Sequence, residues 1–253
     1  MSLRSGRLVS WVRAWRAGLV PFDDVVAAIQ AGDEPHEVAD LPGHVQAMPL
    51  RTALAELSGV DVDAVRLVVP AAGDPRGLPG PGPFSSAALV SGEGAVCGAT
   101  GLVPTVDERV SGSGDLWHTV RWHVLPLPST PVTPETVSVA EAEHDLLDAL
   151  RTSTDALRDL DVARWRPEVA QALADLRRND SRSDLPPGYD DRAHRLLHRA
   201  ELVARIVTIA AEDAPGAAVN VYEAAGRDAA LRPLATAARR ARTAAHNAPL
   251  RLG

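Results

Sequence analysis

The strongest strand signal in the chain is Leu116-Trp117-His118-Thr119-Val120-Arg121-Trp122-His123-Val124-Leu125. Branched and aromatic side chains of this kind pack well on a pleated sheet. Successive side chains of a strand point to opposite faces, so the even-numbered residues share one face and the odd-numbered residues share the other. Both faces carry large apolar side chains. We therefore predict a strand in the interior of a sheet that is covered on both sides.

This strand also holds the densest group of chemically versatile side chains. His118 and His123 are an odd number of positions apart, so they lie on opposite faces and cannot form one site alone. Each could join a pocket with a tryptophan wall and with Arg121 as an anion-binding group. The alternative is a core or interface strand whose histidines have satisfied hydrogen bonds. The candidate ligand-binding residues are Trp117, His118, Arg121, Trp122 and His123.

The residues that precede this strand also indicate β-structure. Val65-Arg66-Leu67-Val68-Val69 is a β-branched run that Pro70 ends. Residues 73–82 are rich in glycine and proline and predict a surface loop, with a lid or a partner-binding loop as the alternative. We expect further strands at 85–90 and 95–106, with a turn between them. Because no helix is expected after the loop, a phosphate-binding role is disfavoured.

The N-terminal residues have helical periodicity. Helices are predicted at 8–19, 22–30 and 50–58, with Trp11 and Trp15 of the first packed on the core. His36-Glu37 begins like a metalloprotease helix, but the second histidine that this motif requires is missing. Residues 36–44 are therefore predicted as a polar loop.

The chain beyond residue 137 is predicted to be helical throughout. Ser138 and Glu141 have the spacing of a capping box at the start of an amphipathic helix. Further helices are predicted at 167–178 and 190–211. Pro215-Gly216 ends the last of these, and one or two more helices cover 217–245, with a restart at Pro233. Consecutive helices on short connections predict an up-and-down bundle.

These elements predict the α+β class. An N-terminal helical segment leads into a small, mainly antiparallel sheet, and a C-terminal helical bundle follows. We expect a mixed helical and β domain at 1–130 and the bundle at 131–253. The bundle either stands alone or packs with the first domain as one unit.

Composition excludes several chemistries. All 26 basic residues are arginine, so a P-loop lysine, a Schiff-base lysine and a Ser-x-x-Lys pair are impossible. Cys97 is the one cysteine, which excludes an intrachain disulfide and a Cys-x-x-Cys motif and favours a reducing, cytoplasmic setting. The net charge of -7 gives no general attraction to nucleic acid. No membrane span, targeting segment or cofactor is expected.

Two histidine motifs have a residue spacing that occurs in metal sites. His194, His198 and Glu201 are spaced to share one face of a helix. That face lies about 140° from the apolar stripe, at 100° per residue, so we expect it to be solvated rather than to hold a metal. Glu141 and His144 match the di-iron spacing Glu-x-x-His. His144 is expected on the polar face, however, and no second such motif follows.

Three functions remain open. The first is a non-enzymatic module that binds a protein partner or a second copy of itself, because every catalytic template fails and aromatic and arginine side chains are enriched at interfaces. The second is a small-molecule-binding protein or an enzyme, with a pocket between sheet and bundle lined by Trp117, Arg121 and His123. The third, which the acidic net charge makes the weakest, is contact with nucleic acid through the arginine-rich C-terminal helix.

Overall fold

The computed structural model describes residues 3–33, 35–56, 59–129, 136–159, 184–212 and 221–251. Internal contacts divide the chain into two compact units. The sheet unit comprises residues 2–136, 184–189 and 249–253, and the helical unit comprises 137–183 and 190–248. The predicted α+β class is confirmed by these elements.

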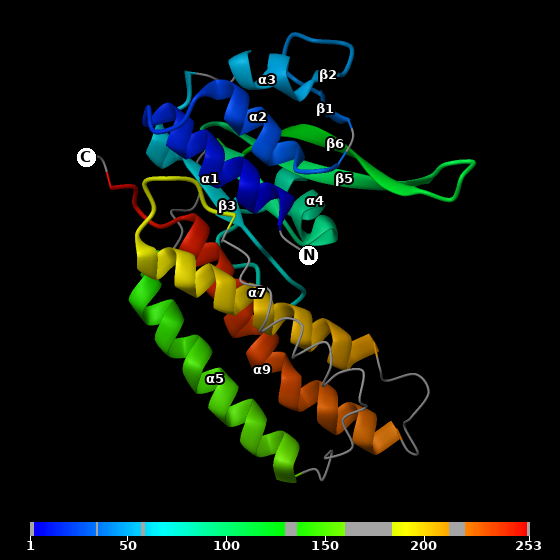
Figure 1. The fold of residues 1–253 in the computed structure, drawn as a ribbon, viewed down its shortest axis with the longest axis vertical. Helices are drawn as coiled ribbons and strands as arrows, with labels where there is room; N and C mark the ends of the chain where they lie inside the picture. The colour runs from blue at the N-terminus through cyan, green and yellow to red at the C-terminus, as the bar shows by residue number, and fades with distance from the viewer. Residues whose placement is uncertain are drawn as a thin grey trace. The chain divides into compact units, whose positions relative to one another are not determined.

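The sheet unit is built on six strands in the order β2-β1-β6-β5-β4-β3 (Figure 1). Strand β6 pairs in parallel with β1 and antiparallel with β5, and the other neighbours are antiparallel. The expected mainly antiparallel sheet is thus confirmed, with one parallel pair. The bounds are β1 His36–Ala39, β2 Met48–Pro49, β3 Val65–Val68, β4 Gly94–Cys97, β5 Thr100–Val110 and β6 Leu116–Pro126.

Helices cover both faces of the sheet. The main core lies under α1 (Arg4–Arg16) and α2 (Phe22–Gln30), where Leu8 and Ile29 pack with Leu67, Leu102 and Trp122. Trp11 and Trp15 are half buried against this core, as expected. A short helix, α3 (Leu50–Glu56), adds Leu50, Ala53 and Leu54 to it. The opposite face carries a smaller core under α4 (Pro83–Ser91), in which Phe84 and Ala88 contact Val68, Val96 and Val103.

Helix α4 corrects the prediction of a strand at 85–90. Pro83 occupies the first turn and Gly92 follows the end with a φ of 76°, which is the Pro-start, Gly-stop pattern of a helix. The glycine and proline loop is therefore followed by a helix, contrary to expectation. Opposite this helix, a Cβ at Gly101 would collide with the ring of Phe84. The glycine allows β5 to pass directly beneath the aromatic ring.

The prediction of a polar loop at residues 36–44 is also wrong for its first four residues. Residues His36–Ala39 form β1, and His36 is fully buried. The strand forms because Val38 lies beside Trp122 of β6 and completes the core there. A four-residue strand of mixed polarity has no local signal, since its stability comes from pairing with β6, over 80 residues away.

Strand β6 lies in the sheet interior as predicted, but it is covered on both sides along part of its length only. Beyond β1 and β4 the strands β5 and β6 continue as a two-stranded ribbon, visible at the right of Figure 1. We call residues 105–119 the hairpin arm. Its residues 105–110 and 112–117 are all exposed.

Residues 184–189 pack on α1 within the sheet unit, and residues 249–251 lie beside them. The indole Nε1 of Trp11 donates to the carbonyl of Asp184 at 2.9 Å, and Arg13 Nη1 donates to the Tyr189 hydroxyl at 3.2 Å. Burial raises the pKa of Tyr189 to about 12. The backbone N–H of Arg251 donates to the carbonyl of Gly188 at 2.8 Å. The sheet unit therefore includes the segment that precedes α7 and the segment that follows α9.

The described helices of the helical unit are α5 (Val139–Asp159), α7 (Asp191–Glu212) and α9 (Val221–His246). Helix α9 packs against the other two. The predicted capping box opens α5: Glu141 Oε2 accepts from the Ser138 backbone N–H at 2.9 Å, and Ser138 Oγ accepts from the Glu141 N–H at 3.2 Å. None of the described helices is long and apolar enough to cross a membrane.

Helix α9 continues through Pro233, so the predicted restart there is wrong. Proline removes a helical N–H and displaces the preceding turn, which weakens the bonds to nearby carbonyls. The buried hydroxyl of Ser153 in α5 donates to the carbonyl of Ala230 at 2.8 Å in this turn. A neighbouring helix thus binds a carbonyl in the turn that precedes the proline. The predicted helix at 167–178 and the break at 215–216 lie outside the described residues.

Candidate functional site

The candidate residues of β6 divide between the two faces of the sheet. Trp117, Arg121 and His123 follow one another along an open face, where Arg121 Nη2 lies 3.2 Å from Glu37 Oε2 and His123 Nδ1 lies 2.8 Å from Asp40 Oδ2. Both pairs are exposed to solvent, so each ion pair is weak. These three side chains therefore lie in one row on the same face of β6.

The glycine and proline loop lies elsewhere in the sheet unit. Arg66 Nη1 of β3 donates to the carbonyl of Gly77 at 2.6 Å, and Ser85 Oγ of α4 donates to the carbonyl of Gly80. Leu78 packs against the small core under α4. Strands β4 and β5 separate β3 from β6. The described contacts of the loop therefore hold it near β3, away from Trp117, Arg121 and His123.

Trp122 and His118 point to the opposite, helix-covered face. Trp122 is completely buried, and its Nε1–H donates to Nδ1 of His36 at 3.2 Å. An indole nitrogen can only donate, so Nδ1 of His36 must be unprotonated and the proton of the neutral ring must be on Nε2. That nitrogen lies 3.7 Å from Asp33 Oδ2. Trp122 thereby sets both the tautomer and the orientation of the His36 ring.

Asp33 is the centre of a buried polar group that we call the Asp33 cluster: Arg4, Arg7, Asp33, His36 and His118. Arg4 binds the carboxylate with two nitrogens, Nε at 2.7 Å and Nη2 at 3.0 Å. Arg7 Nη2 lies 4.0 Å from Oδ2, and His118 Nδ1 lies 3.8 Å from Oδ1. The Asp33 side chain is 11% exposed. Four elements therefore meet at one carboxylate: α1, the turn after α2, β1 and β6.

The charges of the Asp33 cluster are set by burial and by the arginines. Burial opposes ionisation of Asp33, but the hydrogen bonds and charge of Arg4 outweigh it and lower the pKa of the carboxyl. Burial lowers the pKa of His36 to about 4, and the negative charge of Asp33 only partly offsets it. His36 is therefore neutral at pH 7, which agrees with the tautomer that Trp122 imposes. Asp33 is therefore a carboxylate with two guanidinium groups and a neutral imidazole as neighbours.

A second buried carboxylate holds the start of α1. Leu3 at the N-cap position provides no side-chain cap. Instead Glu93, which follows α4, accepts the Ser5 backbone N–H at 2.7 Å through Oε2. A carboxylate at a helix N-terminus satisfies a free N–H and interacts favourably with the helix dipole. Asp33 and Glu93 together attach the first turn of α1 to the sheet unit.

Sequence patterns did not identify Arg4, Arg7, Asp33, His36 and Glu93. Their partners lie far apart in the chain, so no motif of fixed spacing links them. One weak signal exists: His36 and Val38 alternate in the manner of a strand, which could have suggested an inward-pointing histidine. The cluster's polar groups face one another, which suits them to positioning α1 and β1 against the sheet.

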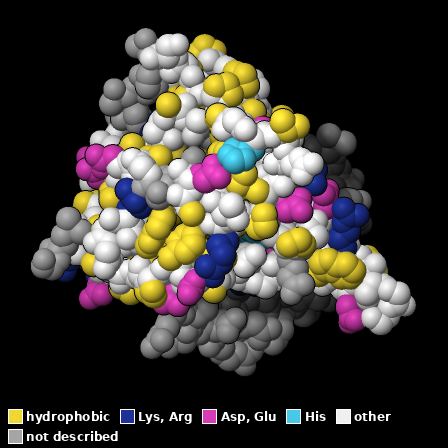
Figure 2. Space-filling model, turned by 90° about the horizontal axis from the view of Figure 1, so that it is seen from above, with side chains coloured by type: hydrophobic (Ala, Val, Ile, Leu, Met, Phe, Trp, Pro, Cys, Tyr) yellow, Lys and Arg dark blue, Asp and Glu magenta, His cyan; other side chains and the backbone are white. Residues whose placement is uncertain are grey.

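The hairpin arm has the opposite character. Its large apolar side chains are uncovered: Val106 is 38% exposed, Val110 64%, Leu116 56% and Trp117 38%. The tip is a polar turn in which Ser113 Oγ donates to Asp115 Oδ2 at 2.6 Å. Figure 2 shows hydrophobic side chains next to charged ones along the projection at the right of the view. The arm therefore exposes more large apolar surface than its pairing within the sheet requires.

In the helical unit, the candidate metal ligands His194, His198 and Glu201 lie half buried along α7. His144 is 73% exposed, and its Nε2 lies 3.1 Å from Asp148 of the same helix. Across the described ranges, no three histidine, cysteine or acidic side chains are placed to hold a metal ion. Of the C-terminal arginines, Arg239, Arg240 and Arg242 are half buried.

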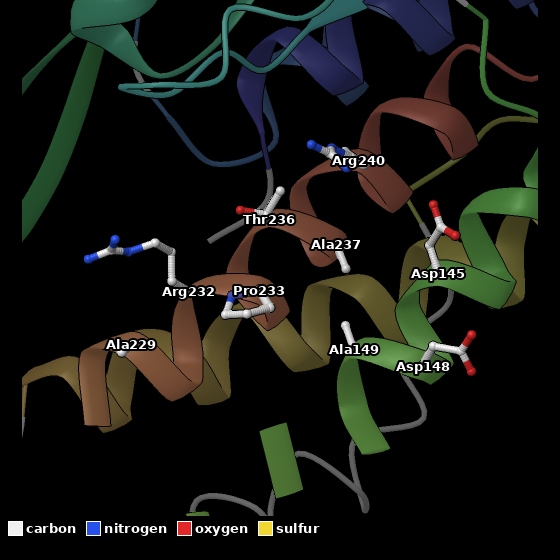
Figure 3. A pocket seen from close by; sticks show the side chains of 9 residues that line it. All are labelled: Asp145, Asp148, Ala149, Ala229, Arg232, Pro233, Thr236, Ala237 and Arg240. Carbon is white, nitrogen blue, oxygen red and sulfur yellow. The ribbon is translucent and has the colours of Figure 1, made fainter. Parts of the chain in front are cut away.

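A shallow groove runs between α5 and α9. In Figure 3, Ala149 of α5 and Ala237 of α9 point toward one another in its floor, and these small side chains leave the space open. Asp145 and Asp148 border the groove on α5, and Arg232 and Arg240 border it on α9. The groove therefore has an acidic edge and a basic edge, and neither cysteine nor histidine lines it.

Comparison with known proteins places both units in one family. Residues 5–137 match the family model described as Rv1486c-like protein, N-terminal domain, and residues 140–243 match the corresponding C-terminal domain. The uncharacterized protein Rv1486c of Mycobacterium tuberculosis is 29% identical over 95% of this chain and 94% of its own length.

A relative from Mycobacterium leprae, the uncharacterized protein ML1804, is 26% identical over 95% of both chains. No solved structure matches the chain significantly. The names of these relatives state no activity. The two adjoining family matches span nearly all of the sequence, and the chain therefore belongs to the Rv1486c-like protein family.

Proposed function

We propose that this chain is a non-enzymatic protein-interaction module that docks its partner through the hairpin arm. One observation carries the proposal: four large apolar side chains, Val106, Val110, Leu116 and Trp117, are 38% to 64% exposed on a two-stranded ribbon beyond the rest of the sheet. Each would gain free energy from burial against a partner.

The geometry of the arm favours a polypeptide partner. Among the described residues, no strand pairs with the outer edge of β5 beyond its contact with β4, which ends at Leu102, or with the outer edge of β6 before its contact with β1, which begins at Val120. Exposed strand edges bind further strands through main-chain hydrogen bonds. A two-stranded ribbon alone is also only marginally stable in water, so a third strand would stabilise the arm.

The distribution of polar groups supports binding rather than catalysis. In the Asp33 cluster the polar side chains face one another, with Asp33 bound by Arg4 and His36 held by Trp122. The arm exposes Asp107, Glu108 and Arg109 beside its apolar side chains. Charged residues at the rim of an apolar patch are typical of protein interfaces, where they contribute specificity.

Site-specific photocrosslinking in cells tests the proposal. A photoreactive phenylalanine analogue replaces Trp117 in the arm, and in a matched control it replaces Val45, which is fully exposed in a loop of the same unit. We expect crosslinks to one defined polypeptide from position 117 and none above background from position 45. The crosslinked peptide is identified by mass spectrometry.

A second variant links the crosslink to the apolar surface. Val110→Asp combined with Leu116→Asp should abolish crosslinking from position 117, because the two carboxylates disrupt the apolar row on the even-numbered face and the partner then leaves the ribbon, including Trp117 on its other face. Equal crosslinking from positions 117 and 45, or crosslinking unaffected by the double substitution, would overturn the proposal.

A further inference from the structure

We infer that the partner of the hairpin arm is a second copy of this chain, paired antiparallel through β5. This inference rests on the proposed docking role of the arm and adds the identity and register of the partner. The resulting dimer would join the two arms into a four-stranded sheet in the order β6-β5-β5-β6, with a two-fold axis at Glu108.

The backbone determines which residues of β5 can pair with another chain. Ser111 donates its N–H to Asp115 across the hairpin at 2.9 Å, so the odd-numbered residues of β5 direct their N–H and C=O groups toward β6. The even-numbered residues Val106, Glu108 and Val110 therefore direct theirs outward. Pro104 is also even-numbered and has no N–H to donate, so outward pairing ends before it.

Centring the pairing on Glu108 uses every outward donor from Val106 to Val110. Val106 of each copy lies opposite Val110 of the other, and these two residues exchange both backbone hydrogen bonds. Asp107 of each copy lies opposite Arg109 of the other, at the closer, non-hydrogen-bonded positions. Opposite charges at such positions stabilise a pair of strands. The segment 106–110 is thus complementary to itself in charge and in apolar character.

The same register also brings together the cross-strand pairs of apolar side chains in the two arms, so that they form continuous rows across the joined sheet. Within one arm Val106 pairs with Val120 and Val110 pairs with Leu116. In the joined sheet each row becomes Leu116, Val110, Val106 and Val120, with two residues from each copy. A shift of one residue would place the charged residues opposite the valines and break both rows. Glu108 faces its own copy at the axis, which is the one unfavourable pair.

A charge exchange tests the register with the full chain. Asp107→Arg alone and Arg109→Asp alone each place like charges opposite one another twice per dimer. We expect the dimer dissociation constant, measured by sedimentation, to rise about tenfold for each. The double variant Asp107→Arg/Arg109→Asp keeps the composition and restores both pairs, so its constant should return to within about threefold of the original.

Cysteine trapping tests the position of the axis. Glu108→Cys should form an intermolecular disulfide under mild oxidation, because opposed residues of a hydrogen-bonded pair have Cα atoms about 5.5 Å apart. Asp107→Cys should not, because it faces Arg109. The native Cys97 is buried and burial raises the pKa of its thiol to about 12, so it does not compete.

The outcomes separate this inference from the proposed function. A chain that stays monomeric at high concentration, a double variant that fails to restore the dimer, or equal trapping by Asp107→Cys and Glu108→Cys overturns the self-pairing. Crosslinks from position 117 to a different protein would then leave the docking role of the arm intact. Absence of any crosslink would remove both.

Discussion

The two halves of strand β6 have the same alternation of side chains between the two faces of the sheet, but one half is buried in part and the other is exposed. From Val120 to His123 the strand has neighbours on both sides, β1 and β5, and its buried Trp122 binds His36. From Leu116 to Thr119 it has β5 alone as a neighbour, and Leu116 and Trp117 are exposed. The inner half pairs Trp122 with His36 out of reach of water, and the outer half exposes Leu116 and Trp117 to it.

This contrast shows that the point at which the neighbouring strands end determines which side chains of a strand are buried and which are exposed. Strand β1 covers β6 over four residues only, and β4 covers β5 over three. Inside that region a polar side chain needs an internal partner, because burying it without one costs free energy. Outside it, apolar side chains of β5 and β6 such as Val110 and Leu116 remain exposed to solvent.

The largest expected effect is at the centre of the inner region. Asp33→Ala leaves Arg4 and Arg7 without their shared carboxylate and should destabilise the sheet unit by about 3–5 kcal/mol, since removing one partner of a buried ion pair leaves an uncompensated charge. Urea unfolding followed by tryptophan fluorescence measures it. The matched control Asp107→Ala, whose partner Arg109 is 58% exposed, should change stability by less than about 0.5 kcal/mol. Equal effects would refute the contrast.

The second effect is a dependence on pH. His36 has a pKa of about 4 in the folded chain against an ordinary value of 6.5, so between these values the unfolded chain binds a proton that the folded chain does not. Stability should therefore fall by about 3 kcal/mol as pH decreases from 6.5 to 4. His36→Gln, which retains donor and acceptor groups, should have a smaller slope in this window. Urea midpoints at half-unit pH steps would show it, and identical slopes would contradict it.

A smaller effect is expected from the indole donor of the inner half. Trp122→Phe removes the N–H that His36 Nδ1 accepts and should cost about 2 kcal/mol, because that nitrogen stays buried without a partner. Trp117→Phe on the outer half should cost less than about 0.5 kcal/mol. Thermal unfolding of the two variants compares them directly. Similar losses would show that both halves depend on their indole groups alike.

The smallest effect on stability is expected at the arm itself. Leu116→Ser should change the free energy of unfolding of the monomer by less than about 0.5 kcal/mol, because its side chain is already 56% exposed. The same substitution should weaken association through the arm. Dilute-sample unfolding and sedimentation separate the two quantities. A loss of several kcal/mol in the monomer would mean that the arm is part of the core.

Much of the fold could be predicted from local sequence. The helical periodicity near Leu8, the capping box at Ser138 and the alternation of β6 each arise from side chains a few positions apart. The failures have equally specific causes. Helix α4 differs from the predicted strand because Pro83 and Gly92, which occur in loops and turns as well, here begin and end a helix. Strand β1 was missed because β6 supplies its hydrogen bonds.

The candidate residues of β6 were chosen for their chemistry, and alternation correctly separated His118 from His123. It could not show that Trp122 would be used to orient His36, or that His118 would lie 3.8 Å from Asp33. Likewise, alternation predicted cover on both faces of β6 but carried no information on where β1 would end.

Short-range pattern thus sufficed for the class of the fold, for most helices and for the central strand, because periodicity and capping act within one or two turns of chain. Folding in three dimensions was needed to bring Arg4, Asp33, His36 and Trp122 together and to leave the arm beyond its neighbours. Those outcomes depend on contacts between residues up to 86 positions apart, whose free energy appears only when the chain has packed.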